Sequence, residues 1–212
     1  CKFSDITVFS FHPVKIITTG EGGAAITNDK KIHIRLQSFR SHGILFNLKK
    51  KNKEKKVRPW MFYQVDLGYN YRLTDIGAAL GLSQIKKLNF FLKKRNKIAK
   101  IYNQKLKNFP LKLPKVKPKC LSSFHLYIVL IKKNKKINRD LFYKKLLKNK
   151  IKTNIHYIPI YRHPYFKKFK FDKKNFKNNE VYFNQAISLP IYPDLSISEI
   201  NKVISVIKNI FK

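Results

Sequence analysis

A proline-rich segment, FPLKLPKVKPK at 109–119, is the feature that most constrains how this chain can fold. Proline has no backbone N–H and a fixed φ angle, so three prolines within nine positions exclude both a continuous helix and a central strand there. Elements that precede this segment therefore have to end, and a second set has to begin after it. We expect two domains, 1–112 and 113–212, and the second has a common domain size.

Before the break, the sequence predicts two short strands, a helix and a loop. DITVFSF at 5–11 is β-branched and aromatic, and AAITND at 24–29 is a second apolar run after a glycine-rich turn. A helix is expected over 30–39. The stretch 42–57 contains the run KKKNKEKK, which is too charged to pack, so we expect a surface loop.

A single long helix is predicted from 74 to 106. Thr74 is a favourable N-cap, with Asp75 in the first turn. The first turns, IGAALGL, contain two glycines that lower helix propensity, so we expect these turns to pack closely between elements or subunits. Apolar residues recur at intervals of three or four positions, or of twice that, and form one stripe, made of Ile76, Leu80, Leu88, Leu92, Ile98 and Ile101.

After the break, the pattern predicts a small α+β domain, which places the whole chain in the α/β class. Asn138 is expected to open the first helix of this domain, and Ser198 and Glu199 are expected to start the last one. An irregular basic stretch precedes that last helix. The expected elements are strands over 123–131 and 151–158 and helices over 138–149 and 196–210.

Net charge is the most prominent property of the composition. The 212 residues contain 47 Lys and Arg against 11 Asp and Glu, a net charge of +36, which favours nucleic acid or another anionic partner. However, 40 of the 47 are lysines, whereas recognition of bases and phosphates favours the rigid guanidinium of arginine. The lysines are spread over the whole chain without a nucleic-acid-binding motif. We therefore expect a solvated surface and no specific nucleic-acid partner.

Other function classes are excluded by features that the sequence lacks. No run of eighteen apolar residues occurs, so we expect no membrane span and a soluble, cytoplasmic protein. Cys1 and Cys120 are too few for a disulfide framework and have no metal-ligand spacing, so no metal is expected. Because the chain begins at Cys1, close to a strand-like run, we expect it to be a C-terminal fragment.

The loop between the first two strands contains a lysine with distinctive neighbours. Lys15 lies between Val14 and Ile16, where burial would lower its pKa and leave a neutral amine able to form a Schiff base. From the residues alone, a hairpin with one buried or snorkelling lysine is the preferred interpretation. The same loop offers hydroxyls and flexible glycines to a phosphate: Ser10, Thr18, Thr19, Gly20, Gly22 and Gly23.

Three strings resemble one enzyme family: FSFHPVKIITTGEGGAAITND at 9–29, RSHG at 40–43 and LGYNYRLTDIGAALGLSQ at 67–84. Together they closely resemble the DegT/DnrJ/EryC1/StrS family of sugar-nucleotide aminotransferases over nearly the whole chain. The resemblance implies a fold-type-I transferase that depends on pyridoxal 5'-phosphate (PLP), represented here by the C-terminal part of the large domain and the small α+β domain. It also implies that Lys15 holds PLP as a Schiff base and that Ser10 binds the cofactor phosphate.

The same resemblance suggests further residues of the site. Asn70 is implied to reach across a homodimer to the cofactor phosphate of the other subunit, so that the active sites are shared. From the residues alone, Asn70 is a turn asparagine before the Thr74 cap. Arg72 and His12 are candidate substrate-binding residues; the alternatives are a brace for the helix start and a packed histidine at a strand end.

Within the family, the C-terminal half is most similar to the branch of pseudaminic-acid biosynthesis. HYIPIYRHPYF at 156–166 and AISLPIYPDLS at 186–196 carry this similarity, and they make His156 and Tyr157 candidate substrate contacts. The implied reaction moves an amino group from an amino acid, with L-glutamate expected, to C4 of a UDP-linked 4-keto-6-deoxy-N-acetylhexosamine. Another sugar aminotransferase, a noncatalytic fragment and a basic binding module are the alternatives.

One part of the expected cofactor site is missing from the sequence. Fold-type-I enzymes pair an aspartate with the pyridine nitrogen of the cofactor. The family places this aspartate, the ring-stacking residue and further phosphate donors well upstream of the lysine, and Asp5 is too close to Lys15 for the role. We therefore expect the chain to be inactive alone.

Overall fold

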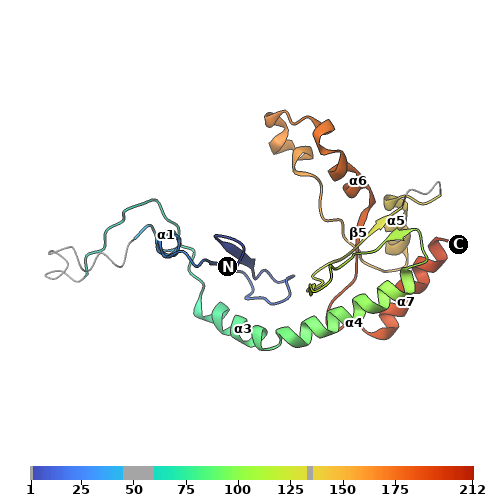
Figure 1. The fold of residues 1–212 in the computed structure, drawn as a ribbon, viewed down its shortest axis with the longest axis horizontal. Helices are drawn as coiled ribbons and strands as arrows, with labels where there is room; N and C mark the ends of the chain where they lie inside the picture. Colours follow the sequence, from blue (N-terminus) through green and yellow to red (C-terminus); the bar gives the residue numbers. More distant parts are fainter. Residues whose placement is uncertain (1, 45–59, 133–135) are drawn as a thin grey trace. The chain divides into compact units, whose positions relative to one another are not determined.

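A computed structural model describes residues 2–44, 60–132 and 136–212 (Figure 1). Within these ranges, no helix is both long and apolar enough to cross a membrane. The chain forms two compact units, Cys1–Leu88 and Asn89–Lys212. This division precedes the proline-rich segment, because the helix before the prolines contributes its buried side chains to the core of the second unit. The domain boundary near 112 stays a prediction.

The N-terminal unit begins with an antiparallel hairpin, as predicted. β1 (Thr7–Ser10) pairs with β2 (Gly23–Ile26), and Ser10 lies opposite Gly23. A Cβ at position 23 would lie 2.6 Å from the carbonyl oxygen of Phe9, so this close approach of the two strands requires glycine. The hairpin holds the two ends of its connecting loop together.

α1 (Lys30–Arg40) follows the hairpin and confirms the helix predicted over 30–39. Asp29 is its N-cap, because the carboxylate accepts hydrogen bonds from the backbone N–H groups of Lys31 and Ile32. The surface loop predicted over 42–57 falls largely outside the described residues.

The predicted long helix is two helices in the structure. α3 (Asp75–Lys86) and α4 (Leu88–Leu106) are separated at Lys87, which has φ −94° and ψ −2° and forms a turn. The prediction of one uninterrupted helix is therefore wrong at this residue. The predicted cap is confirmed, because the Thr74 hydroxyl accepts a hydrogen bond from the backbone N–H of Gly77.

The apolar stripe of these helices is buried only in its second half. Ile98 is 4% exposed and Ile101 packs against the core, whereas Ile76 is 86% and Leu80 40% exposed. Among the described residues, every buried side chain of the hydrophobic core belongs to the C-terminal unit. The large apolar side chains of α3 are therefore exposed within this chain, and their burial between subunits stays a prediction.

The C-terminal unit contains an antiparallel sheet with the strand order β3-β4-β5. The central strand, β4 (Tyr127–Ile131), lies within the strand predicted over 123–131. β3 (Leu111–Lys112) forms an edge inside the proline-rich segment, which is where prolines are tolerated. β5 (Ala186–Leu189) is absent from the predicted elements. All four of its residues are buried, so it lacks the alternation by which a strand is recognised.

Both helices predicted for this unit after the proline-rich segment are present, whereas its second predicted strand is not. α5 (Arg139–Lys148) has the predicted N-cap, Asn138. α7 (Ile197–Ile210) is also confirmed, but its N-cap is Ser196, which forms a capping box with Glu199. The strand predicted over 151–158 is wrong, because that segment forms a single β-bridge there, between Asn154 and Ser188.

One hydrophobic core joins α4, α5 and α7 to the sheet. Its two tyrosines are fully buried and satisfy their hydroxyl groups within the core. Tyr102 donates to the carbonyl oxygen of Pro190 at 3.0 Å, and Tyr127 donates to Oδ1 of Asn103 at 2.5 Å. Burial raises the pKa of both tyrosines well above the ordinary value, so both stay protonated donors.

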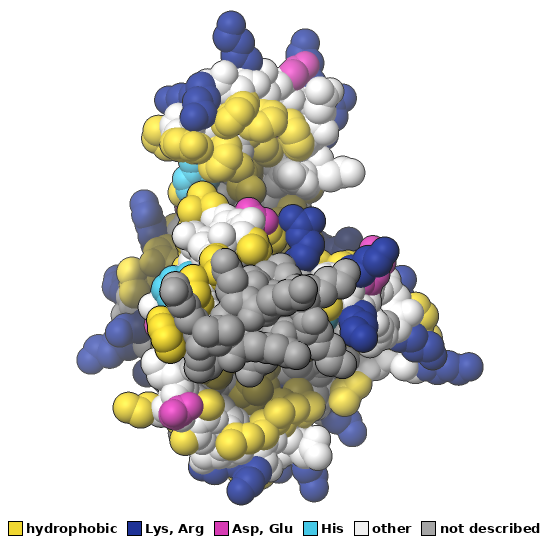
Figure 2. Space-filling view, turned by 90° about the vertical axis from the view of Figure 1, so that its left-hand side faces the viewer, with side chains coloured by type: hydrophobic (Ala, Val, Ile, Leu, Met, Phe, Trp, Pro, Cys, Tyr) yellow, Lys and Arg dark blue, Asp and Glu magenta, His cyan; other side chains and the backbone are white. Residues whose placement is uncertain are grey.

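Residues 160–185 form an arm of short helices. None of the described side chains of the arm is fully buried. Figure 2 shows hydrophobic side chains exposed over the arm, at the top of the view, with lysine and arginine side chains around them. Its elements are η2 (Ile160–Arg162), η3 (Pro164–Phe169), η4 (Lys173–Phe176) and α6 (Lys177–Gln185).

Candidate active site

The loop between β1 and β2 is closed at its base by backbone hydrogen bonds. The N–H of Phe11 donates to the carbonyl oxygen of Gly22 at 2.9 Å, and the carbonyl of Phe11 accepts from the N–H of Thr19 at 3.0 Å. Within this closure, the N–H of Lys15 donates to the carbonyl oxygen of His12 at 2.9 Å. Lys15 therefore lies at the end of a tight, hydrogen-bonded turn.

The side chain of Lys15 is less enclosed than its apolar neighbours suggest. Lys15 is half-buried, and the adjacent Val14 is 61% exposed. Among the residues that the structure describes, no carboxylate forms an ion pair with the Lys15 amine. The turn therefore fixes the backbone of Lys15, and no salt bridge within the described ranges fixes its amine.

Ser10 and His12 lie beside this turn. The N–H of His12 donates to the Ser10 hydroxyl at 3.5 Å, and the N–H of Val14 donates to Nδ1 of His12 at 3.4 Å. Nε2 of His12 lies 3.8 Å from Oε1 of Glu21. Both ring nitrogens of His12 thus contact the loop, but the side chain is 49% exposed and so is not packed, and its contact with a substrate stays a prediction.

Two of the hydroxyl groups that were expected as phosphate ligands form hydrogen bonds within the loop instead. Thr18 Oγ1 donates to the carbonyl of Phe11 at 2.8 Å and accepts from the N–H of Gly20 at 2.9 Å. Thr19 Oγ1 donates to the carbonyl of Glu21 at 2.8 Å. These bonds fix the shape of the loop and leave Ser10 as its exposed hydroxyl.

Thr19 is also the point where the loop meets α3. A Cβ at position 81 would lie 2.9 Å from Cγ2 of Thr19, and one at position 77 would lie 3.4 Å from its carbonyl oxygen. Gly77 and Gly81 are about one turn apart and so face the same side of the helix. The expectation that these glycines mark close packing is confirmed.

Asn70 is positioned by pairing between two of the family-like strings. Asn70 forms a β-bridge with Ser41, and the N–H of His42 donates to the carbonyl of Tyr69 at 2.9 Å. The strings at 40–43 and 67–84 are therefore adjacent in space. Sequence reasoning identified both strings but did not predict this pairing.

Asn70 and Arg72 are expected on one face of their segment. Tyr69 and Tyr71 stack at a centroid distance of 4.9 Å, so their rings share the other face, because side chains alternate along an extended backbone. Arg72 lines a pocket of about 660 Å³ at the start of α3, whereas Lys15, Ser10 and Asn70 do not. The rest of its lining is Thr19, Glu21, Gly22, Gly23, Tyr71, Leu73, Thr74, Ile76, Gly77 and Leu80.

The candidate substrate contacts of the C-terminal unit lie next to β5. Nδ1 of His156 lies 2.8 Å from the hydroxyl of Ser188, a contact that the sequence did not reveal. Tyr157 is 72% exposed, and its ring meets the His156 imidazole edge-on at 4.6 Å. A pocket of about 350 Å³ is lined by His156 and Ser188 together with His125, Leu126, Lys152, Thr153, Asn154, Leu189, Pro190 and Ile191.

Sequence reasoning also missed an ion-pair network in the arm. Oε1 of Glu180 accepts from the hydroxyl of Tyr161 at 2.9 Å and from Nε of Arg162 at 3.0 Å, and Oε2 pairs with Nη2 of Arg162. The signal in the sequence is an isolated acid within a basic segment. The network fixes η2, which follows His156 and Tyr157 along the chain.

Residues 1–208 match the DegT/DnrJ/EryC1/StrS aminotransferase family, and the chain belongs to this family. It is 36% identical over 203 residues to the UDP-4-amino-4,6-dideoxy-N-acetyl-beta-L-altrosamine transaminase of Helicobacter pylori, covering 95% of this chain and 51% of that protein. The family resemblance inferred from the three strings is therefore confirmed.

Solved structures of family members share the fold. PseC of Helicobacter pylori, an aminotransferase involved in the biosynthesis of pseudoaminic acid, matches 99% of this chain with a TM-score of 0.85 and 34% identity. The PMP form of the sugar aminotransferase Spr1654 from Streptococcus pneumoniae matches 98% with a TM-score of 0.86 and 30% identity. These matches cover 54% and 53% of the two structures, so the chain spans about half the length of its relatives. The predicted fold class is confirmed.

Proposed function

We propose that the complete protein is a PLP-dependent aminotransferase. It moves an amino group from an amino acid, with L-glutamate the expected donor, to C4 of a UDP-linked 4-keto-6-deoxy-N-acetylhexosamine. The observation that carries this proposal is the placement of Lys15 on a hydrogen-bonded turn, half-buried and with no ion-pair partner among the described residues. The name of the Helicobacter pylori relative contains a UDP-linked 4-amino-4,6-dideoxy-N-acetyl sugar, which corresponds to the aminated product of this reaction and supports the choice of sugar.

The residues around this turn fit part of a PLP site. Lys15 would bind the cofactor covalently, and the exposed hydroxyl of Ser10 would bind its phosphate. The backbone beside Ser10 is open to close approach, because Gly23 lies opposite it without a side chain. When bound, PLP supplies a protonated ring that accepts electrons from the substrate.

Lys15 has a second role in this proposal. When it is not bonded to the cofactor, the Lys15 amine would take the proton from the amino-bearing carbon of the donor and pass it to the cofactor, and in the second half-reaction it would carry a proton from the cofactor to C4 of the sugar. The loop supports this role because its turn fixes the backbone of Lys15 and leaves the side chain without a salt bridge to break.

We also propose a homodimer, acting in the cytoplasm, in which Asn70 of one subunit completes the phosphate site of the other. The N-terminal unit supports the need for a partner surface. None of its described hydrophobic side chains is buried, and Ile76, Leu82 and Val8 are 86%, 65% and 76% exposed. Apolar surface of this extent favours burial against further protein.

The decisive experiment uses the chain extended upstream through its reading frame. Wild-type protein is expected to hold PLP, and borohydride reduction followed by peptide mapping is expected to find the cofactor on Lys15. Lys15→Ala and Lys15→Arg should both abolish covalent binding and amino transfer, since arginine keeps the charge but cannot form the covalent link. Lys31→Ala, which changes an exposed lysine of α1, should keep full activity. Cofactor fixed to another lysine contradicts the proposal.

The 212-residue chain alone is expected to behave differently. It lacks the upstream residues that the family uses to hold the ring, so we expect weak PLP binding distributed over many lysines and no glutamate half-reaction. Titration with cofactor and assay for the aminated cofactor test this. Binding at one site that is lost in Lys15→Ala would place the essential residues within this chain. A steeply salt-dependent affinity for duplex DNA, without PLP binding in the extended protein, would favour the basic binding module.

A further inference from the structure

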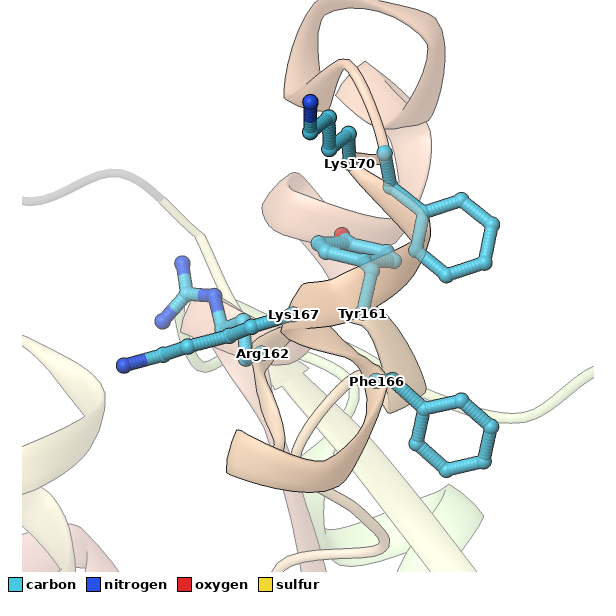
Figure 3. Close-up of a pocket in the computed structure, with 6 residues that line it drawn as sticks. Tyr161, Arg162, Phe166, Lys167 and Lys170 are labelled. Atoms are coloured by element: carbon cyan, nitrogen blue, oxygen red, sulfur yellow. The ribbon is translucent and has the colours of Figure 1, made fainter.

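The arm contains a pocket that none of the assigned residues occupies. It has a volume of about 480 Å³ and lies between η2 and the turn that ends η3. Figure 3 shows Tyr161 at its centre, with Arg162 and Lys167 extending to one side and Phe166 to the other. Its lining is Tyr161, Arg162, Phe166, Lys167, Lys170 and Phe171.

The aromatic part of the pocket is held rigidly. The hydroxyl of Tyr161 donates to Glu180 at 2.9 Å, and its ring stacks on Phe176 at a centroid distance of 4.6 Å. Phe171 meets the same Phe176 ring edge-on at 6.1 Å. Two aromatic walls are thus fixed through one shared ring, and they offer faces on which a planar ring of a ligand can stack.

The cationic part of the pocket is not neutralised. Glu180 neutralises Arg162, whereas no carboxylate in the described ranges forms an ion pair with Lys167 or Lys170. The backbone turn brings the main chains of the two lysines together, because the N–H of Lys170, at φ 46°, donates to the carbonyl of Lys167 at 3.1 Å, and their side chains extend from this turn in different directions (Figure 3). The pocket therefore combines rigid aromatic walls with a pair of uncompensated ammonium groups.

We propose that this pocket binds the nucleoside diphosphate part of the sugar nucleotide, with the base on the aromatic walls and the two phosphates on Lys167 and Lys170. Each phosphate of a diphosphate diester carries one negative charge, so the ligand matches the two free ammonium groups. The segment that bears the candidate sugar contacts, His156 and Tyr157, leads directly into η2. This inference rests on the proposed function and extends it to the nucleotide.

The arm provides a matched control for these lysines. Lys168 lies between Lys167 and Lys170 in sequence and has the same charge, but it does not line the pocket. Its ammonium group lies 4.1 Å from the centroid of the Tyr165 ring and 5.3 Å from that of Phe169. Removing Lys168 therefore lowers the charge of the arm without changing the lining of the pocket.

The test compares the Lys167→Ala/Lys170→Ala double variant with Lys168→Ala by calorimetric titration with UDP, uridine and pyrophosphate. All three lysines are exposed, so the variants should keep the melting temperature of the wild type. Wild-type protein is expected to bind UDP more tightly than uridine or pyrophosphate. The double variant should bind UDP at least about tenfold more weakly, as expected for loss of charge-assisted hydrogen bonds, and Lys168→Ala should stay within about twofold.

The outcomes separate this inference from the proposed function. In the extended enzyme, the double variant should keep the glutamate half-reaction, which involves no nucleotide, and lose the sugar half-reaction through a raised KM. UDP binding unchanged in the double variant overturns the inference while leaving the aminotransferase intact. An equal loss in Lys168→Ala also overturns it, because the lysines would then act only through net charge. Pocket-dependent UDP binding without any amino transfer would support the site and refute the proposed reaction.

Discussion

The hydroxyl of Ser188 lies 2.8 Å from Nδ1 of His156 and ties a candidate substrate contact to the sheet. Ser188 is 6% exposed and lies opposite Ile128 within the β4-β5 pair. It also exchanges two backbone hydrogen bonds with Asn154, at 2.8 and 3.4 Å. Ser188 therefore has little freedom to move, and its bond fixes the plane of the His156 imidazole.

Ser188→Ala is expected to weaken the sugar half-reaction and spare the donor half-reaction. Loss of one hydrogen bond should cost about 1 kcal/mol of stability, and a freely rotating imidazole should lower kcat/KM for the sugar nucleotide about tenfold. Stopped-flow measurement of the two half-reactions in the extended enzyme checks this. Thr153→Val is the control, because the Thr153 hydroxyl lines the same pocket without a hydrogen-bond partner among the described residues. Equal effects of the two substitutions would contradict a positioning role.

Arg95 connects α4 to one end of the β4-β5 pair, where β4 begins and β5 ends. It is 6% exposed, and its Nη1 lies 3.1, 3.2 and 2.9 Å from the carbonyl oxygens of Phe124, His125 and Ile191. Burial lowers the pKa of this guanidinium. Because Nη1 has two hydrogens for three acceptors, these hydrogen bonds are shared and depend on all three segments staying in place.

Arg95→Met is expected to lower the free energy of unfolding by about 3 kcal/mol. The three carbonyl oxygens would lose their hydrogen bonds, and this loss costs more free energy than removal of the buried charge gains. Urea unfolding of the 212-residue chain measures this change in free energy, provided that the transition of the C-terminal unit is the one followed. Lys97→Met on the same helix removes an exposed charge and should change stability by less than about 0.5 kcal/mol. If Arg95→Met matches Lys97→Met, the three carbonyl contacts contribute nothing to stability.

Local chemistry explains which parts of the fold the sequence predicts. Thr74 and Asn138 are recognisable caps because each bonds a backbone N–H within one turn of itself. β5 is missed because its four residues are all buried, and its identity depends on β4, which lies far away in sequence. The break at Lys87 has no local signal, since the apolar spacing continues through it.

The same distinction holds for the candidate site. Lys15 and Ser10 can be identified from the sequence because they belong to one contiguous motif. Asn70 can be identified because it belongs to a second one. The Ser188 contact with His156 joins residues 32 positions apart, and the Glu180 network joins residues 18 and 19 apart. Only the folded sheet and arm bring such pairs together. Ile76 belongs to the predicted apolar stripe but is exposed in the structure. Periodicity thus identifies which face of a helix can be buried, but it does not identify the surface that covers this face.

The capping box of α7 predicts a pH dependence of stability. Hydrogen bonds from the N–H and hydroxyl of Ser196, at 2.8 and 2.7 Å, hold the pKa of Glu199 below its ordinary value. A lowered folded-state pKa stabilises the protein above the ordinary carboxyl range, and this stabilisation is lost as the pH falls through the folded value. Glu199→Gln should therefore lower the melting temperature at pH 7 and become indistinguishable from wild type in strong acid. Ser198→Ala, an exposed neighbour outside the cap, should show no such dependence. A constant difference at every pH would contradict the role of the charge.

Complementation between inactive variants tests the proposed sharing of active sites through Asn70. Its backbone is fixed by the bridge to Ser41, while its side chain is exposed and so available to a second subunit. In the extended enzyme, Lys15→Ala and Asn70→Ala should each be nearly inactive alone. A hybrid dimer would contain one site with both residues intact, and random mixing of equal amounts yields hybrids as about half of the dimers. Recovery of roughly a quarter of wild-type activity is then expected.

Subunit exchange is verified by mass spectrometry of differently tagged chains. Lys15→Ala mixed with a Lys15→Ala/Asn70→Ala double variant is the control that should recover no activity. If exchange is complete and the first mixture stays inactive, Asn70 does not act across the dimer.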